Sequence, residues 1–329
     1  MNLQKIKAIK ITKEIITIPV LILAAYIGIN QKLTQQIEQK EHIREYATTS
    51  ISNIIEEEPK WFEDKEYKTE KKLAKKYPKT YRIPGLIHTD SIDVTLSELL
   101  NDAKYWRIIG PSGWDALPKE VREESLKRQF EKYDYALDSI VWNEMTPNDW
   151  DKVPKVVRMV AFLKIAKKIA EEYELEKYSK QPGSTEAFQS ILIQESYLNH
   201  RSIKRENKTV KPKKNNYKNT DLGIAQNSDW SRNRLRKTPE FKDIKDEEFF
   251  EPLKSISAGA YEFRDRMKEA KGNLELTIKS YNAGIGAARM NTKRAQEYNS
   301  WVQTRLQRLT NPDETTQPTW AYINQKLKE

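Results

Sequence analysis

Apolar residues recur every three or four positions in several parts of the chain, which is the spacing of one face of an α-helix. The clearest stripe follows Pro154 and is formed by Val156, Val157, Val160, Leu163, Ile165, Ala166 and Ile169. A break at residues 181–184 separates it from a second amphipathic stretch, for which Ser184 is the expected N-cap. Two further helices are expected, one around Ile256–Phe263 and one over Leu274–Tyr281. Alternating strand-like runs are few, so the sequence predicts a mainly α fold.

Residues 1–30 have a different pattern. Lysines precede Ile15–Ile29, a run without a charged residue. A basic flank before an apolar run is typical of a secretory signal or an uncleaved membrane anchor. No small-x-small cleavage site follows, so we expect an uncleaved N-terminal anchor, although the run is shorter than the ~20 residues that cross a bilayer squarely. A helix buried in a protein assembly is the alternative.

Residues 31–148 are charge-rich, and we expect them to form a helical spacer or assembly region. Near its end, Gly113–Arg122 is similar in sequence to Asp149–Arg158. In both copies a Trp is followed by a Pro, which the first turn of a helix tolerates. Each copy therefore predicts the start of a helix, with Trp114 or Trp150 packed in the core. A sugar-binding platform made by these Trp side chains is the alternative.

Composition narrows the classes of function. The chain has 329 residues, of which 37% are hydrophobic, enough for the core of one large or two ordinary domains. Its formal net charge is +10, which would favour a polyanionic partner, but no nucleic-acid-binding motif is present. The chain has no cysteine, and its three histidines, His42, His88 and His200, lack metal-ligand spacing. We therefore expect neither a disulfide framework nor a zinc site.

Glu195 is the first candidate catalytic residue. Three- and four-residue spacing places Ile191, Leu192, Glu195 and Leu198 on one face of the second helix. A carboxyl on an apolar face is costly to ionise, so its pKa is expected to be raised. A glutamic acid with a raised pKa can protonate a departing glycosidic oxygen near neutral pH. The alternative is a glutamate at the boundary of a helix.

Two short motifs follow Glu195-Ser196 in the chain. The first is Thr220-Asp221-Leu222-Gly223-Ile224-Ala225-Gln226, and the second is Ser280-Tyr281-Asn282-Ala283-Gly284. They resemble the Gly-Leu-Met-Gln turn and the Ala-Tyr-Asn-x-Gly motif of lytic transglycosylases, and Tyr298 matches a later Tyr of that family. The resemblance covers about residues 154–305, and it implies a lysozyme-like helical domain that cuts the glycan strands of peptidoglycan without a cofactor.

The resemblance also assigns expected roles. Glu195 would be the general acid and base, and Tyr281 would hydrogen-bond and orient it. Gly223 would allow close backbone approach, and Gln226 would hydrogen-bond the sugar. The other expected substrate-binding residues are Ser196, Asn282, which would also brace its turn, and Tyr298.

Asp221 leaves open whether the reaction is hydrolysis or transglycosylation. Transglycosylases usually have a small residue at this position, whereas Thr-Asp-x-Gly-Ile-x-Gln resembles C-type lysozymes, in which the Asp is the second catalytic carboxylate. Retaining glycosidases place two carboxyls about 5 Å apart and finish with water. If Asp221 faces Glu195, hydrolysis is feasible; if it caps the loop, the transglycosylase reaction remains, and the Tyr281 motif favours the latter.

The expected organisation has four parts: residues 1–30, the spacer 31–148, a lysozyme-like domain over 149–305, and a C-terminal tail, 306–329, with Trp320 and Tyr322 as a docking segment. We expect the chain at the cell envelope, facing the periplasm and working with a secretion machine, or in a phage virion. A basic segment between Glu195 and Gly223 is expected to form a loop over the cleft. A non-catalytic wall-binding or virion structural module is the alternative from another class.

Overall fold

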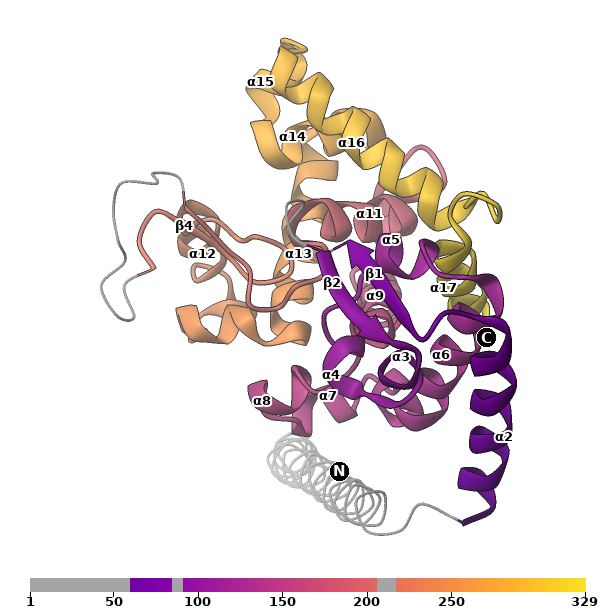
Figure 1. Cartoon of the computed structure of the whole chain (residues 1–329). Helices are drawn as coiled ribbons and strands as arrows, with labels where there is room; N and C mark the ends of the chain where they lie inside the picture. Colours follow the sequence, from indigo (N-terminus) through magenta and orange to yellow (C-terminus); the bar gives the residue numbers. More distant parts are fainter. Residues whose placement is uncertain (1–59, 85–90, 206–216) are drawn as a thin grey trace, which may run out of the picture. The chain divides into compact units, whose positions relative to one another are not determined.

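The computed structural model describes residues 60–84, 91–205 and 217–329 (Figure 1). Within it, Lys68–Glu329 forms one compact unit. The predicted N-terminal anchor lies outside the described residues. Within the described ranges, no helix is both long and apolar enough to cross a membrane.

The first part of the chain forms a short β-hairpin and several helices. Strand β1 (Thr80–Pro84) pairs antiparallel with β2 (Ser91–Thr95), and Thr95 then caps α3 (Leu96–Asn101) in a reciprocal capping box with Glu98. The other elements of this part are α2 (Lys60–Lys76), α4 (Ala103–Trp106), α5 (Pro111–Asp115), α6 (Lys119–Lys132), the 3-10 turn η1 (Asp134–Leu137), α7 (Val141–Glu144) and α8 (Pro147–Trp150).

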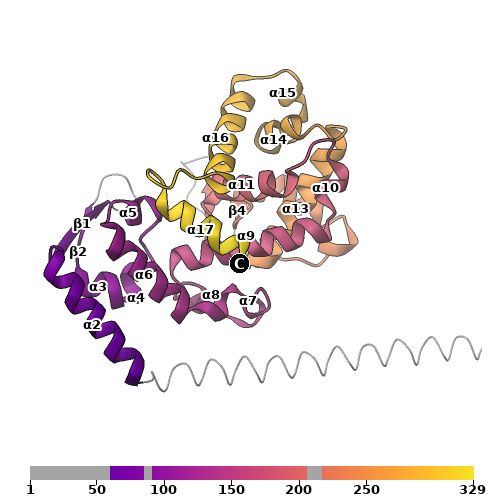
Figure 2. The ribbon, with the colours of Figure 1, turned by 90° about the vertical axis from the view of Figure 1, so that its right-hand side faces the viewer.

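Helix α9 (Lys155–Glu172) is the centre of the fold. It is buried on most sides because α11 (Ser184–Ser196), α13 (Pro252–Glu269) and α17 (Pro318–Lys328) all pack against it (Figure 2). The remaining elements are α10 (Leu175–Tyr178), β3 (Ile203–Arg205), β4 (Thr220–Leu222), α12 (Asp229–Leu235), η2 (Pro239–Phe241), η3 (Asp246–Phe250), α14 (Leu274–Ala283), α15 (Ile285–Arg289) and α16 (Lys293–Thr310). The predicted helical class is confirmed.

The two Trp-containing repeats start helices as predicted. Pro118 and Pro154 occupy the N-cap positions of α6 and α9. Trp114 and Trp150 are 0% and 4% exposed, so both are core residues and neither offers a ring face to a sugar. The predicted N-cap at Ser184 is wrong by one position: Gly183, with φ of 92°, is the N-cap and Ser184 is the first helical residue.

One hydrophobic cluster contains buried residues from both the expected spacer and the expected lysozyme-like domain. It runs from Leu73 through Trp142 to the apolar face of α9. It also contains Trp320 and Ile323 of α17, so the expected C-terminal tail is a helix docked on its own chain. The predicted domain limits stay a prediction, but residues 68–148 share a core with the helices from α9 onward.

Candidate functional site

Glu195 lies in the last turn of α11, partly buried. Its neighbours on the predicted face, Ile191, Leu192 and Leu198, are all buried. Burial raises the pKa of Glu195 from 4.5 to about 7, and the negative charges of Asp221 and Glu262 add to the rise. The predicted apolar face and its effect on the carboxyl are confirmed.

Tyr298 is the hydrogen-bond partner of this carboxyl. Helix α16 packs along α11, and the Tyr298 hydroxyl donates a 2.5 Å bond to Oε1 of Glu195. The bond favours the ionised carboxylate and so lowers its pKa, against the larger effect of burial. Tyr298 itself is buried, which raises its own pKa well above 10.0 and keeps it a donor.

Tyr281 does not make the bond that was predicted for it. Its hydroxyl donates to the carbonyl oxygen of Ala225, at 3.4 Å. The prediction was wrong because Tyr281 projects from α14, which brings the ring to the turn that contains Ala225, whereas α16 faces Glu195 directly. Tyr281 therefore braces the turn beside the carboxyl.

Gly223 begins that turn and has a φ of +72°. A Cβ there would lie 1.9 Å from the carbonyl oxygen of Phe249 and 2.5 Å from Oγ of Ser255, so only glycine fits. Ser255 Oγ accepts a 3.2 Å bond from the Ala225 amide. Ser196 Oγ donates a 2.8 Å bond to the carbonyl oxygen of Ile224, which ties the turn to the end of α11.

Gln226 closes the same turn. Its side-chain Nε2 donates to the carbonyl oxygens of Gly223, at 2.8 Å, and Ser202, at 3.2 Å. Its Oε1 is buried and has no hydrogen-bond partner within the described part of the chain. The amide is thus held by its nitrogen, while its acceptor is unused; the expected sugar contact stays a prediction.

Asn282 lies at the end of α14. Its Oδ1 accepts a 2.9 Å bond from Nε of Arg294, in α16. The contact ties α14 to α16 just before Gly284, which has a φ of 79°. The expected role of Asn282 in substrate binding stays a prediction.

Asp221 lies opposite Lys204 in the β3–β4 hairpin. Directly opposite residues of an antiparallel pair have side chains on the same face, where opposite charges attract. The two charges act on Glu195 in opposite directions: Lys204 lowers its pKa and Asp221 raises it. Most of the predicted basic loop lies outside the described residues.

Sequence reasoning missed Glu262. This buried residue of α13 accepts a hydrogen bond from Ser231 Oγ and lies 3.4 Å from Arg266 and 3.8 Å from Arg234. Its charge reaches Glu195, whose pKa it raises. Its spacing in the sequence could have indicated that it is buried, because Glu262 follows Ala258 and Gly259 at helical spacing, on the buried face of α13.

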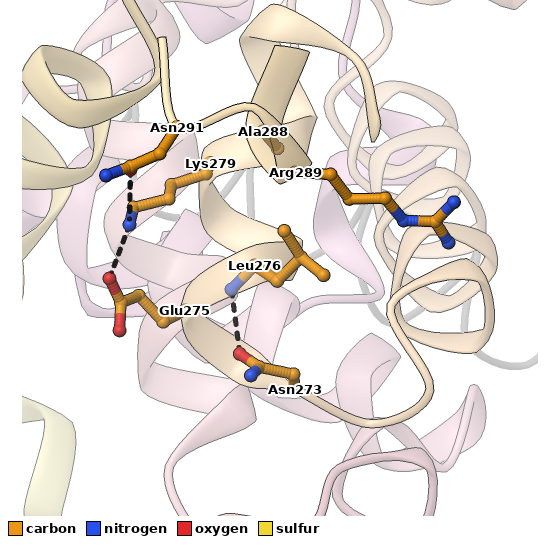
Figure 3. Close-up of a pocket in the computed structure, with 7 residues that line it drawn as sticks. All are labelled: Asn273, Glu275, Leu276, Lys279, Ala288, Arg289 and Asn291. Atoms are coloured by element: carbon orange, nitrogen blue, oxygen red, sulfur yellow. Dashed lines mark hydrogen bonds and ion pairs between the residues drawn. The ribbon is translucent and has the colours of Figure 1, made fainter. Parts of the chain in front are cut away.

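Two further features of the described residues concern metal and ligand binding. They contain no cluster of His, Cys, Asp or Glu that could hold a metal ion. A surface cavity of about 340 Å³ lies between α14 and α15 (Figure 3). Three of its polar side chains pair with one another, since Lys279 bonds both Glu275, at 2.6 Å, and Asn291, at 3.0 Å. Arg289 points away from them.

One comparison with known proteins found a match. A family model described as "Transglycosylase SLT domain" matches residues 172–304, which include Glu195, the turn at Gly223, Tyr281 and Tyr298. Neither the curated proteins nor the solved structures gave a match. Residues 172–304 therefore match a transglycosylase SLT domain, the domain of the lysozyme-like lytic transglycosylase family.

Proposed function

We propose that the protein is a lytic transglycosylase that cleaves the β-1,4 bond between N-acetylmuramic acid and N-acetylglucosamine, with Glu195 as general acid and then general base. One observation carries the proposal: a carboxyl with a pKa of about 7 is held by the Tyr298 hydroxyl beside the Gly223 turn. Near neutral pH such a group exists in both forms, so it can give a proton and take one back.

The proposed reaction has two steps. Protonated Glu195 gives its proton to the glycosidic oxygen as the bond from the muramoyl anomeric carbon breaks, and the substrate N-acetyl group assists at that carbon. The Glu195 carboxylate then takes the proton of the muramoyl 6-hydroxyl as this oxygen attacks the anomeric carbon. The product is a 1,6-anhydro sugar, no water is consumed, and Glu195 ends protonated as it began.

Hydrolysis with Asp221 as the second carboxylate is the alternative reaction. The influence of Asp221 on the Glu195 pKa favours it, because it indicates that the two carboxyls sense each other's charge. The position of Lys204 opposite Asp221 supports the first proposal instead, since it places a cation across the hairpin from Asp221, where opposite charges attract.

The proposed partners are peptidoglycan glycan strands. The proposed setting is local wall opening, either at the cell envelope with a secretion machine and a membrane anchor in residues 1–30, or in a phage virion during genome delivery. The formal charge of +10 suits a surface rich in anionic wall polymers or lipid headgroups.

Mass spectrometry of muropeptides released from purified peptidoglycan by the full chain tests the proposal. We expect anhydro-muramoyl products, and we expect Glu195→Gln to reduce their release about 10²- to 10⁴-fold, the range of general acid–base catalysis. Glu186→Gln is the matched control, because Glu186 lies in the first turn of the same helix and should leave release unchanged. Reducing-end products would identify hydrolysis, and a folded chain that binds peptidoglycan without releasing products would indicate a wall-binding module.

A further inference from the structure

The backbone directly after the catalytic helix has an unusual conformation. Tyr197 and Leu198 have φ values of 53° and 57°, so two consecutive non-glycine residues are left-handed. Side-chain sterics disfavour this conformation, and it persists only where surrounding contacts fix it. The contacts that fix Tyr197 therefore help to set where α11 ends, and Glu195 lies only two positions earlier.

The Tyr197 ring is held between two side chains from other elements. The Lys155 ammonium, at the start of α9, lies 4.6 Å from the ring centroid, within the range of a cation–π interaction. The Trp320 ring, from α17, lies 6.4 Å away in an edge-to-face arrangement. Burial lowers the pKa of Lys155 to about 8, which still leaves most of it charged at neutral pH.

Two hydrogen bonds hold helix α17 in place, one on each side of Trp320 in the sequence. The Thr319 amide donates a 2.8 Å bond to Oδ1 of Asp115, and Nδ2 of Asn324 donates a 2.6 Å bond to the carbonyl oxygen of Leu309. Trp320 is 3% exposed. Its ring is thus fixed in place and can restrain Tyr197.

Lys155 and Trp320 both lie outside the matched SLT segment, residues 172–304, while Tyr197 lies inside it. We propose that Lys155 and Trp320 are positioning residues, which hold the end of the catalytic helix through Tyr197 and so keep the Glu195 carboxyl against Tyr298. The matched segment is incomplete without them. The catalytic role of Glu195 rests on the proposed function, whereas the positioning of its carboxyl does not.

Tyr322 distinguishes positioning from general packing. It lies on the same helix as Trp320, but its ring packs on Phe130, with a centroid distance of 5.4 Å. Trp320→Leu and Tyr322→Leu should both weaken the docking of α17. Only the first removes a contact to Tyr197.

The test uses the full chain and two readouts. The first is kcat and KM for anhydro-muropeptide release. The second is the titration midpoint of the Glu195 carboxyl, obtained by infrared difference spectroscopy against Glu195→Gln, which needs no activity. For Trp320→Leu and Lys155→Met we expect kcat to fall about tenfold with KM unchanged, and the midpoint to move from about 7 towards the ordinary value of 4.5 as water reaches the carboxyl. Trp320→Phe, which keeps an aromatic ring beside Tyr197, should leave kcat and the midpoint at their wild-type values.

Tyr322→Leu should leave the midpoint unchanged even if the melting temperature falls. Equal effects of Trp320→Leu and Tyr322→Leu on both readouts would overturn the proposal, as would an unchanged midpoint in Lys155→Met. If Trp320→Leu does not fold, the results for Lys155→Met and Trp320→Phe decide whether the positioning proposal holds. If the wild-type chain releases no product, the proposed function fails, while the infrared midpoint still tests the positioning.

Discussion

The Tyr298 hydroxyl donates a 2.5 Å hydrogen bond to Oε1 of Glu195, across the packed faces of α16 and α11. Two opposing effects meet at this carboxyl: burial raises its pKa, and the bond from Tyr298 lowers it. The result, about 7, divides the carboxyl between its two protonation states near neutral pH.

Tyr298→Phe should raise the pKa of Glu195 further, because the bond it removes favours the ionised form. A hydrogen bond to a charged group contributes about 1.5–3 kcal/mol, so we expect the alkaline limb of the pH–rate profile to move up by about one pH unit or more. We also expect kcat to fall about tenfold, because a carboxyl with a higher pKa gives its proton to the glycosidic oxygen less readily. Tyr281→Phe is the control, because its hydroxyl bonds Ala225; an equal shift in that variant would contradict the assignment.

The two charged residues of the β3–β4 hairpin should shift the pKa of Glu195 in opposite directions. Lys204→Met removes a cation that lowers this pKa, so the alkaline limb should move to higher pH. Asp221→Asn removes an anion that raises it, so the limb should move to lower pH. Charges that face solvent are screened, so each shift should be about half a pH unit. A pH–rate profile of each variant measures it, and loss of all activity in Asp221→Asn would instead assign Asp221 an essential part in the reaction.

The elements that sequence analysis predicted correctly depend on local patterns. Helical spacing placed Glu195 on a buried face, and the conformational freedom of glycine pointed to a tight approach at Gly223. The choice between Tyr281 and Tyr298 could not be made in this way, since it depends on how α14 and α16 pack around α11. The contact between Tyr197 and Trp320 is equally non-local, because it joins elements that are far apart in the sequence.

Gly223→Ala should destabilise the fold and abolish activity together. The new Cβ would meet the Phe249 carbonyl oxygen at 1.9 Å, and the φ of +72° disfavours any side chain. Backbone strain and the clash together should cost about 3 kcal/mol or more. Urea denaturation measures the loss. Gly286→Ala is the matched control, because a Cβ at Gly286 meets no atom within 4 Å, and it should change the free energy of unfolding by less than about 1 kcal/mol.

His200 and Glu195 should make the stability of the fold depend on pH in opposite senses. Glu195 has a pKa of about 7 in the folded chain and 4.5 ordinarily. Its contribution is therefore complete below pH 4.5 and is lost as pH rises towards 7. His200 is buried beside Trp150, and burial, followed by the charge of Arg158, lowers its pKa from 6.5 to about 4. Its contribution is complete above pH 6.5 and is lost as pH falls towards 4.

In the wild-type chain the two contributions should largely cancel between pH 4.5 and 6.5, and single substitutions should separate them. In Glu195→Gln the free energy of unfolding should rise with pH over this window relative to the wild type, by about 1.4 kcal/mol per pH unit. In His200→Phe, which keeps an aromatic ring beside Trp150, it should fall with pH by a similar amount relative to the wild type. Urea denaturation at half-unit intervals from pH 4 to pH 8 measures both slopes. Because all other titrating groups are shared, parallel curves for the three proteins would show that neither residue is held in the protonation state assigned here.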